Sequence, residues 1–201
     1  AGWRAGRVRR AGLVRFVNRA WRWTNMVASM LTARAWLAAG PCIVAYGDVV
    51  YHAEVVRRLA ISADDIDITY DPHWLALWRA RFQQPEHDAE SLRVVDGRVR
   101  AIGGRVDDVE AIDGQFMGLL RLTPVGLAQI DAHLARGPAG ESAHLETTHL
   151  LAAMIAEGVR VGAVAVGGGW CEIDRIEDLT LYERRLRDDP TWRHDWRKGP
   201  F

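Results

Sequence analysis

The sequence predicts a layered α/β fold, in which helices cover a sheet. Short apolar runs rich in strand-forming residues alternate along the chain with segments whose apolar residues recur at helical spacing. This order of helix, strand, helix and strand is typical of α/β proteins. The chain has 201 residues, of which 49% are hydrophobic, and this is enough for one domain with a substantial core.

The expected elements follow one another with short connections. The expected strands cover residues 13–17, 42–46, 65–70, 92–95, 99–102, 115–121, 159–166 and a short run from Trp170. The expected helices cover residues 26–39, 53–59, 74–82, 124–134, 145–157 and 176–187, and a loop rich in Gly and Pro covers 136–142. No internal repeat or low-complexity linker is visible in the sequence. We therefore expect one domain over residues 1–187 and a tail over 188–201.

Local signals set several of these boundaries. Asp-Gly at 96–97 is the strongest short turn signal and predicts a hairpin between the two runs that flank it. Proline is well tolerated in the first turn of a helix, so Pro72 and Pro124 each mark a helix start. Gly40-Pro41 ends the first helix, which Thr24-Asn25 can cap at its other end. These signals support the alternation on which the fold prediction depends.

Charge is balanced overall but unevenly distributed. Eight arginines precede the first acidic residue, Asp48, although the formal net charge is zero. A solvated basic surface would explain this, and so would a phosphate-rich partner such as a nucleotide, a nucleic acid or a lipid headgroup. The sequence leaves both explanations open.

Membrane and cysteine signals favour a cytoplasmic protein. No run is long and apolar enough to span a bilayer, and the basic start lacks the apolar core of a signal peptide. Cys42 and Cys171 have no CxxC spacing, so neither a metal site nor a disulfide framework is expected. We expect both to be reduced core thiols.

Two aspartates follow apolar strands. Asp48 ends the run 42–46, and Asp174 follows the strand that begins at Trp170. Ligands gather at the carboxyl ends of strands in open α/β sheets. Two carboxylates from distant strands suit Mg²⁺, which keeps water and phosphate oxygens in its shell. The sequence leaves open whether the two aspartates meet, and Asp48 could instead cap the helix that starts near His52.

Tyr70, Asp71 and Trp74 form a second constellation. An aromatic face beside a carboxylate suits an ammonium group, through cation–π attraction and ion pairing. Trp74 and Trp78 stand four residues apart, however, so they could equally be the buried face of an amphipathic helix. A cationic ligand and a helix core therefore remain alternatives for this segment.

Other motifs exclude several classes of site. The glycine run 167–169 precedes a strand and not a helix, so it matches neither a dinucleotide loop nor a P-loop, and we expect a flexible turn. The seven histidines show no metal-ligand spacing, and we expect most to face solvent. No serine lies in a nucleophile elbow, so a hydrolase triad is not expected.

Five short motifs appear in a characteristic order along residues 17–186. They are Thr24-Asn25-Met26-Val27-Ala28-Ser29, Tyr46-Gly47-Asp48-Val49-Val50-Tyr51, Ile68-Thr69-Tyr70-Asp71 with Trp74 and Trp78-Arg79-Ala80-Arg81-Phe82, Gly114-Gln115-Phe116-Met117-Gly118-Leu119, and Trp170-Cys171-Glu172-Ile173-Asp174. Each motif alone is weakly specific. Together they resemble the bacterial phosphocholine cytidylyltransferase-like branch of the nucleotidyltransferases.

The resemblance implies a fold, a reaction and a set of site residues. The fold is a Rossmann-like nucleotide-diphosphosugar transferase fold, with a mixed, mainly parallel sheet between helices. In the reaction, the phosphate of a small substrate, with phosphocholine as the expected one, attacks the α-phosphate of CTP and pyrophosphate leaves. The family's Mg²⁺ ligands match Asp48 and Asp174. The substrate's choline or amine end would lie near Tyr70, Asp71 and Trp74, in a cleft also lined by Gln115, Trp170 and Glu172.

The start of the chain departs from the family pattern. The family opens with a strand and a Gly-rich loop that carries a basic residue and cradles the triphosphate. Nothing here matches that loop, and residues 1–5 resemble the turn after the family's second strand. We therefore expect an N-terminally truncated, carboxyl-terminal part of the enzyme, which alone binds CTP poorly because the backbone donors are missing. Gly47 and Phe116 are milder departures.

Two alternative hypotheses about the function stay open. The same fold could act on 2-aminoethylphosphonate or on a sugar phosphate. Alternatively, the chain could be a non-catalytic module whose basic segment, residues 4–22, contacts anionic lipid or, as a less expected partner, nucleic acid. The sequence does not determine the nucleotide base, the acceptor or the oligomeric state.

Overall fold

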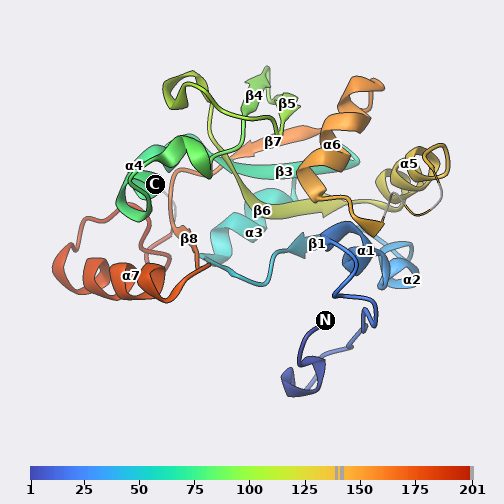
Figure 1. Ribbon diagram of the computed structural model, residues 1–201, viewed down its shortest axis with the longest axis horizontal. Coiled ribbons are helices and arrows are strands. Elements are labelled where there is room, and N and C mark those ends of the chain that lie inside the picture. Colours follow the sequence, from blue (N-terminus) through green and yellow to red (C-terminus); the bar gives the residue numbers. More distant parts are fainter. Residues whose placement is uncertain (139, 141–142, 200–201) are drawn as a thin grey trace. The chain divides into compact units, whose positions relative to one another are not determined.

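The computed structural model describes residues 1–138, 140 and 143–199, which form two compact units (Figure 1). The first unit comprises residues 1–42 together with the described part of 122–159. The second comprises residues 43–121 together with 160–199. Among the described residues, no helix combines the length and the apolar character that a bilayer crossing requires. The second unit contains every site residue that the sequence predicts.

The first unit is helical. Its helices are α1 (Met26–Leu31), α2 (Arg34–Leu37), α5 (Pro124–Leu134) and α6 (Thr147–Ala156), with the short 3-10 helix η1 (Ala5–Arg7) near the start. Asn25 caps α1, because its side chain accepts a hydrogen bond from the Met26 N–H at 2.8 Å. The single helix expected over 26–39 is interrupted after Leu31. Its buried residues, Val27 and Leu37, lie on the two separate pieces.

The prediction of a strand over 13–17 is wrong, because the structure has no strand there. Leu13 and Val14 are 56% and 60% exposed, so the segment has no buried face. Its neighbouring backbone groups bond within the N-terminal segment, where the N-terminal amine donates to the Phe16 carbonyl at 2.8 Å. Without an adjacent strand, a short apolar run stays irregular.

The second unit is built on a six-stranded mixed sheet with the order β1-β6-β3-β7-β5-β4. The strands are β1 (Cys42–Ala45), β3 (Ile66–Asp71), β4 (Leu92–Val95), β5 (Arg98–Ile102), β6 (Gln115–Leu122) and β7 (Gly162–Ala165). Strands β3 and β7 are parallel, with Ile68 opposite Ala163, whereas β5 is antiparallel to both β7 and β4 (Figure 1). The α/β class predicted from the sequence is confirmed.

The hairpin β4–β5 forms as expected. Asp96 and Gly97 both have positive φ angles, 51° and 70°, as a tight two-residue hairpin turn requires. Glycine adopts this conformation without steric cost, and aspartate is among the few other residues that tolerate it. The sequence signal therefore worked because both turn positions need an unusual backbone conformation.

A two-stranded antiparallel ladder joins β2 (Val49–Tyr51) to β8 (Trp170–Glu172). In its register Val49 lies opposite Glu172 and Tyr51 lies opposite Trp170. The backbone pairing extends one step further, since the Ile173 N–H donates to the Asp48 carbonyl at 2.8 Å. Strand β2 was not expected, because three residues are too few to show a period.

The helices of this unit are α3 (Ala53–Ala60), α4 (Trp74–Arg81) and α7 (Ile176–Asp188), with the short helices η2 (Pro85–His87) and η3 (Val109–Ala111). All three longer helices were expected at these positions. The cap of α3 is His52, whose Nδ1 accepts from the Glu54 N–H at 3.1 Å. The alternative in which Asp48 caps this helix is therefore wrong.

The segment after α7 is packed against the second unit. The Trp192 ring stacks on Tyr182, with centroids 5.7 Å apart, and the Gly169 N–H donates to the Arg193 carbonyl at 3.0 Å. His194 and Asp195 are buried. Residues 189–199 of the expected tail thus pack with this unit. Residues 200–201 of the tail lie outside the described part of the chain, as do 139 and 141–142 of the expected loop.

Candidate functional site

The β2–β8 ladder brings the two predicted metal ligands to the same end of one small sheet. Asp48 immediately precedes β2, and Asp174 follows β8 by two residues. Because Val49 pairs with Glu172, both aspartates lie just beyond that pair. Asp48 is exposed, and its carboxylate forms no ion pair with the residues that the structure describes. The ladder thus brings the backbones of the two aspartates close together, and whether their carboxylates meet stays a prediction.

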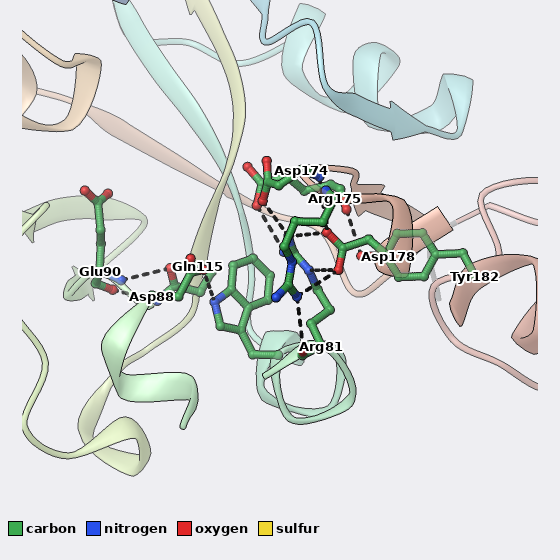
Figure 2. A network of polar contacts seen from close by, with 10 residues as sticks. Arg81, Asp88, Glu90, Gln115, Asp174, Arg175, Asp178 and Tyr182 are labelled. Atoms are coloured by element: carbon green, nitrogen blue, oxygen red, sulfur yellow. Dashed lines mark hydrogen bonds and ion pairs between the residues drawn. The ribbon is translucent and has the colours of Figure 1, made fainter. Parts of the chain in front are cut away.

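Arg81, at the end of α4, lies among the carboxylates of this site (Figure 2). Its side chain is fully buried, and its guanidinium donates to Glu172 Oε2 at 3.1 Å and to Asp174 Oδ2 at 2.5 Å. The same guanidinium bonds both oxygens of Asp178, at 3.2 and 3.3 Å. One cation therefore binds three carboxylates.

Asp178 fixes the turn between β8 and α7. Its carboxylate accepts hydrogen bonds from the backbone N–H groups of Asp174 and Arg175, at 3.2 and 3.1 Å. Burial would raise the pKa of Asp178, but its bonds with Arg81 and Arg175 outweigh burial and the pKa is lowered. Asp178 is therefore ionised and holds the backbone on which Asp174 stands.

Negative charge exceeds positive charge around Glu172. Burial is the main cause that raises the pKa of this carboxyl to about 7, and the charge of Asp174 raises it further. Asp48 acts in the same direction, while Arg81 opposes both. Burial and the nearby carboxylates therefore both disfavour the ionised form of Glu172.

The donor set suits Mg²⁺ without forming a complete metal cage. Among the described residues, no three His, Cys, Asp or Glu side chains are grouped closely enough to hold a metal ion. Mg²⁺ commonly binds through one or two carboxylates together with water and substrate phosphates. Asp48 is exposed, and Asp174 uses Oδ2 for Arg81 while Oδ1 accepts no hydrogen bond from the described part of the chain. Both residues thus fit the expected role, which stays a prediction.

Asp71 is buried at the end of β3. Its carboxylate accepts hydrogen bonds from the His73 N–H at 2.7 Å and from Trp170 Nε1 at 2.8 Å. The Nε2 atom of His194 lies 3.2 Å from the same carboxylate but forms no hydrogen bond with the described residues. Burial raises the pKa of Asp71 and lowers the pKa of His194 to about 4, so the imidazole is neutral near pH 7.

The tryptophans expected near a substrate amine are in the hydrophobic core. Trp74 and Trp170 are 2% and 1% exposed. Trp78 packs edge-on against Trp74 at 5.7 Å and lies 6.1 Å from Trp170. The buried-face interpretation of the helix 74–82 therefore describes this structure, and contact of a substrate with Trp74 or Asp71 stays a prediction. Tyr70 is half-buried on β3.

Gln115 holds a neighbouring loop. Its side-chain amide donates to the Glu90 carbonyl at 2.6 Å and accepts from the Glu90 N–H at 3.2 Å. In the same loop, Asp88 accepts a hydrogen bond from Trp78 Nε1 at 3.0 Å (Figure 2). Trp78 thus connects this loop to Arg81, whose guanidinium carbon lies 5.0 Å from the Trp78 ring centre.

Two surface cavities lie beside Asp88 and Arg81. The larger, of about 470 Å³, is lined by residues 86–90 and 103–107 and includes the Asp88 carboxylate. The smaller, of about 360 Å³, lies along α4 and α7 and reaches Arg81, Arg175 and Asp178. Polar surface predominates in the larger cavity, which suits a small polar ligand, whereas apolar surface predominates in the smaller one.

Sequence reasoning missed three important residues of the site. Arg81 stood within a quoted motif without a role, and Asp178 was hidden in an amphipathic helix rich in charges. Most histidines were expected to face solvent, and nothing singled out His194, which is only 2% exposed. An aspartate four residues after Asp174, at the first turn of a helix, is the one signal that could have indicated Asp178.

Comparison with known proteins gives one related sequence and several related folds. A CTP:phosphoglutamine cytidylyltransferase from Campylobacter jejuni is 29% identical over 177 residues, which cover 83% of this chain and 70% of the relative. No protein-family model matches the chain. The sequence likeness agrees with the enzyme class expected above, the nucleotidyltransferases.

Solved structures identify the fold. The inositol-1-phosphate CTP transferase from T. maritima matches with a TM-score of 0.59 and 17% identity, over 83% of this chain and 63% of that protein. The nucleoside-diphosphate-sugar pyrophosphorylase from Vibrio cholerae RC9 matches with a TM-score of 0.52 and 11% identity, over 79% of this chain and 64% of that protein. The chain thus spans less than two thirds of either solved protein. It has the mixed α/β fold of nucleotide-sugar transferases.

Proposed function

We propose that the protein is a cytidylyltransferase that transfers a cytidylyl group from CTP to the phosphate of a small acceptor, releasing pyrophosphate. The observation that carries this proposal is the placement of Asp48 and Asp174 at one end of the β2–β8 ladder, beside the carboxylates of Glu172 and Asp178. The sequence likeness to a CTP-dependent enzyme supports the nucleotide, and the fold supports the reaction class.

In this proposal, Asp48 and Asp174 are the residues that would hold a Mg²⁺ ion. When bound, the ion would neutralise charge that develops on the phosphate oxygens during an in-line displacement. Arg81 and Asp178 keep the β8–α7 turn in place. No nucleophile from the protein is required, because the acceptor phosphate itself attacks. The chain's own contribution is therefore positioning and electrostatic stabilisation.

For the acceptor we propose a small phosphorylated molecule with a cationic end. Carboxylates outnumber cations around Arg81, and Asp88 extends the acidic surface into the larger cavity. Phosphocholine, which the family resemblance implies, and 2-aminoethylphosphonate both carry a positive end. Phosphoglutamine and inositol 1-phosphate, named for the similar proteins, extend the set of candidates.

A substrate panel tests the proposed reaction. Protein expressed from its complete gene is incubated with Mg²⁺, each acceptor and CTP, and pyrophosphate release is measured alongside ³¹P NMR of the product. We expect CTP to support turnover at least about tenfold faster than ATP, GTP or UTP, equivalent to about 1.4 kcal/mol of discrimination. Turnover with a sugar phosphate and not with a cationic acceptor would refute the proposed acceptor class. No turnover with any acceptor would refute the reaction.

A further inference from the structure

The side chain of Arg81 is held from two directions. Its guanidinium contacts three carboxylates, and its flat face lies 5.0 Å from the ring centre of Trp78 and 4.8 Å from that of Phe82. None of the side chain is exposed. Burial of a charged group is tolerated only when hydrogen bonds and counter-charges replace water. The contacts therefore fix the orientation of the guanidinium as well as its position.

Only an arginine can make this set of contacts. Its planar fork presents five N–H donors in fixed directions, so it can bond Glu172, Asp174 and Asp178 at once. A lysine ammonium is a point charge without that plane, and it also loses the stacking on the two aromatic rings. Replacing Arg81 by lysine therefore keeps the positive charge while it removes the planar arrangement of N–H donors.

The hydrogen bond from Arg81 is made to only one of the two carboxylate oxygens of Asp174. Oδ2 lies 2.5 Å from the guanidinium, and Oδ1 accepts no hydrogen bond from the described residues. The backbone of Asp174 is held separately, by the bond from its N–H to Asp178. The side chain of Asp174 is 42% exposed, so without Arg81 its carboxylate would be free to rotate.

We propose that Arg81 is a positioning residue for the cation site, which holds Asp174 by Oδ2 so that Oδ1 is directed toward a divalent cation. This inference rests on the proposed function, because it takes Asp174 as a cation ligand. Partners of metal ligands commonly change metal affinity by tenfold or more when they are lost. Arg81 does not touch the substrate, and it acts on the cation through Asp174.

The test compares Arg81→Lys with Arg79→Lys, using Mn²⁺ alone as the probe. Arg79 lies on the same helix, 59% exposed and paired with Glu110, so it is a matched control. Binding is followed by electron paramagnetic resonance of free Mn²⁺, at a temperature where circular dichroism shows all proteins folded. We expect Arg81→Lys to raise the Kd for Mn²⁺ by about tenfold or more, and Arg79→Lys to leave it unchanged.

The outcomes separate the inference from the proposed function. If the wild-type protein binds no Mn²⁺, the proposed cation site itself is refuted. If it binds and Arg81→Lys binds equally well, only the positioning role fails, and Arg81 is a structural residue. A purely structural role would lower the melting temperature without moving the Kd of the folded protein.

A measurement on the wild-type protein keeps the inference testable if Arg81→Lys does not fold. The guanidinium N–H resonances of Arg81 are followed by ¹⁵N NMR during a titration with Mg²⁺. We expect them to stay protected from exchange with solvent, because Arg81 and the cation use different oxygens of Asp174. Loss of this protection on adding Mg²⁺ would show that the cation displaces Arg81, and would overturn the proposal.

Discussion

Replacing Asp48 or Asp174 by asparagine is expected to reduce cytidylyl transfer by about a thousandfold or more, while the fold is retained. Each substitution removes one of the two charges proposed to hold the cation, whose stabilisation of transition-state charge amounts to several kcal/mol. Asparagine keeps the size of the side chain, and Asp48 is exposed, so little packing is lost. The measurement is pyrophosphate release by protein from the complete gene at saturating CTP and acceptor.

The control for this pair is Asp188→Asn. Asp188 lies at the end of α7 with its side chain 61% exposed, far along the helix from Asp174. We expect its transfer rate to equal that of the wild-type protein. A near-normal rate in Asp48→Asn or Asp174→Asn, with circular dichroism unchanged, would remove that residue from the cation site.

Replacing Gly168 by alanine is expected to destabilise the protein by about 3 kcal/mol. Gly168 has a φ of +93°, and a Cβ there would lie 2.4 Å from the Arg193 carbonyl oxygen. A side chain in the left-handed region costs about 1–2 kcal/mol, and overpacking against backbone adds about 1–3 kcal/mol. Chemical denaturation measures the loss, and increased proteolysis of residues 189–199 should accompany it.

Gly158→Ala measures the free-energy cost of the positive φ angle alone, without a steric clash. Gly158 ends α6 with a φ of +88°, but a Cβ there would meet no atom within 4 Å. We expect it to cost about 1 kcal/mol, the part due to conformation alone. Equal losses in the two variants would mean that close packing of the C-terminal segment on Gly168 contributes nothing to stability.

The elements with strong local signals could be predicted from the sequence. The hairpin at 96–97 needs positive φ at both turn residues, and α5 begins where Thr123 accepts the Gly126 N–H. These signals lie within a few residues of the structure that they cause. The prediction of one helix over 26–39 was less accurate. The helix is interrupted at Thr32-Ala33, where no Gly or Pro marks the interruption in the sequence.

The candidate site was predictable only in part. Asp48 and Asp174 could be identified because each follows an apolar run that is visible in the sequence. Arg81 could not, since nothing local shows that a helix end will be buried between carboxylates almost a hundred residues away. His194 was missed for the same reason, because it is buried beside Asp71, far from it in sequence.

The long separation between the paired strands has a consequence for the order of synthesis. Strand β2 finds its partner, β8, only after more than half of the chain has followed it, and Gly169 then needs Arg193 beyond that. On the ribosome, the segment carrying Asp48 therefore emerges long before the strand against which it pairs. Closing so long a loop is entropically costly and slow. A nascent chain must keep residues 49–51 unpaired until β8 has been synthesised, which makes this the interval in which a chaperone would protect it most.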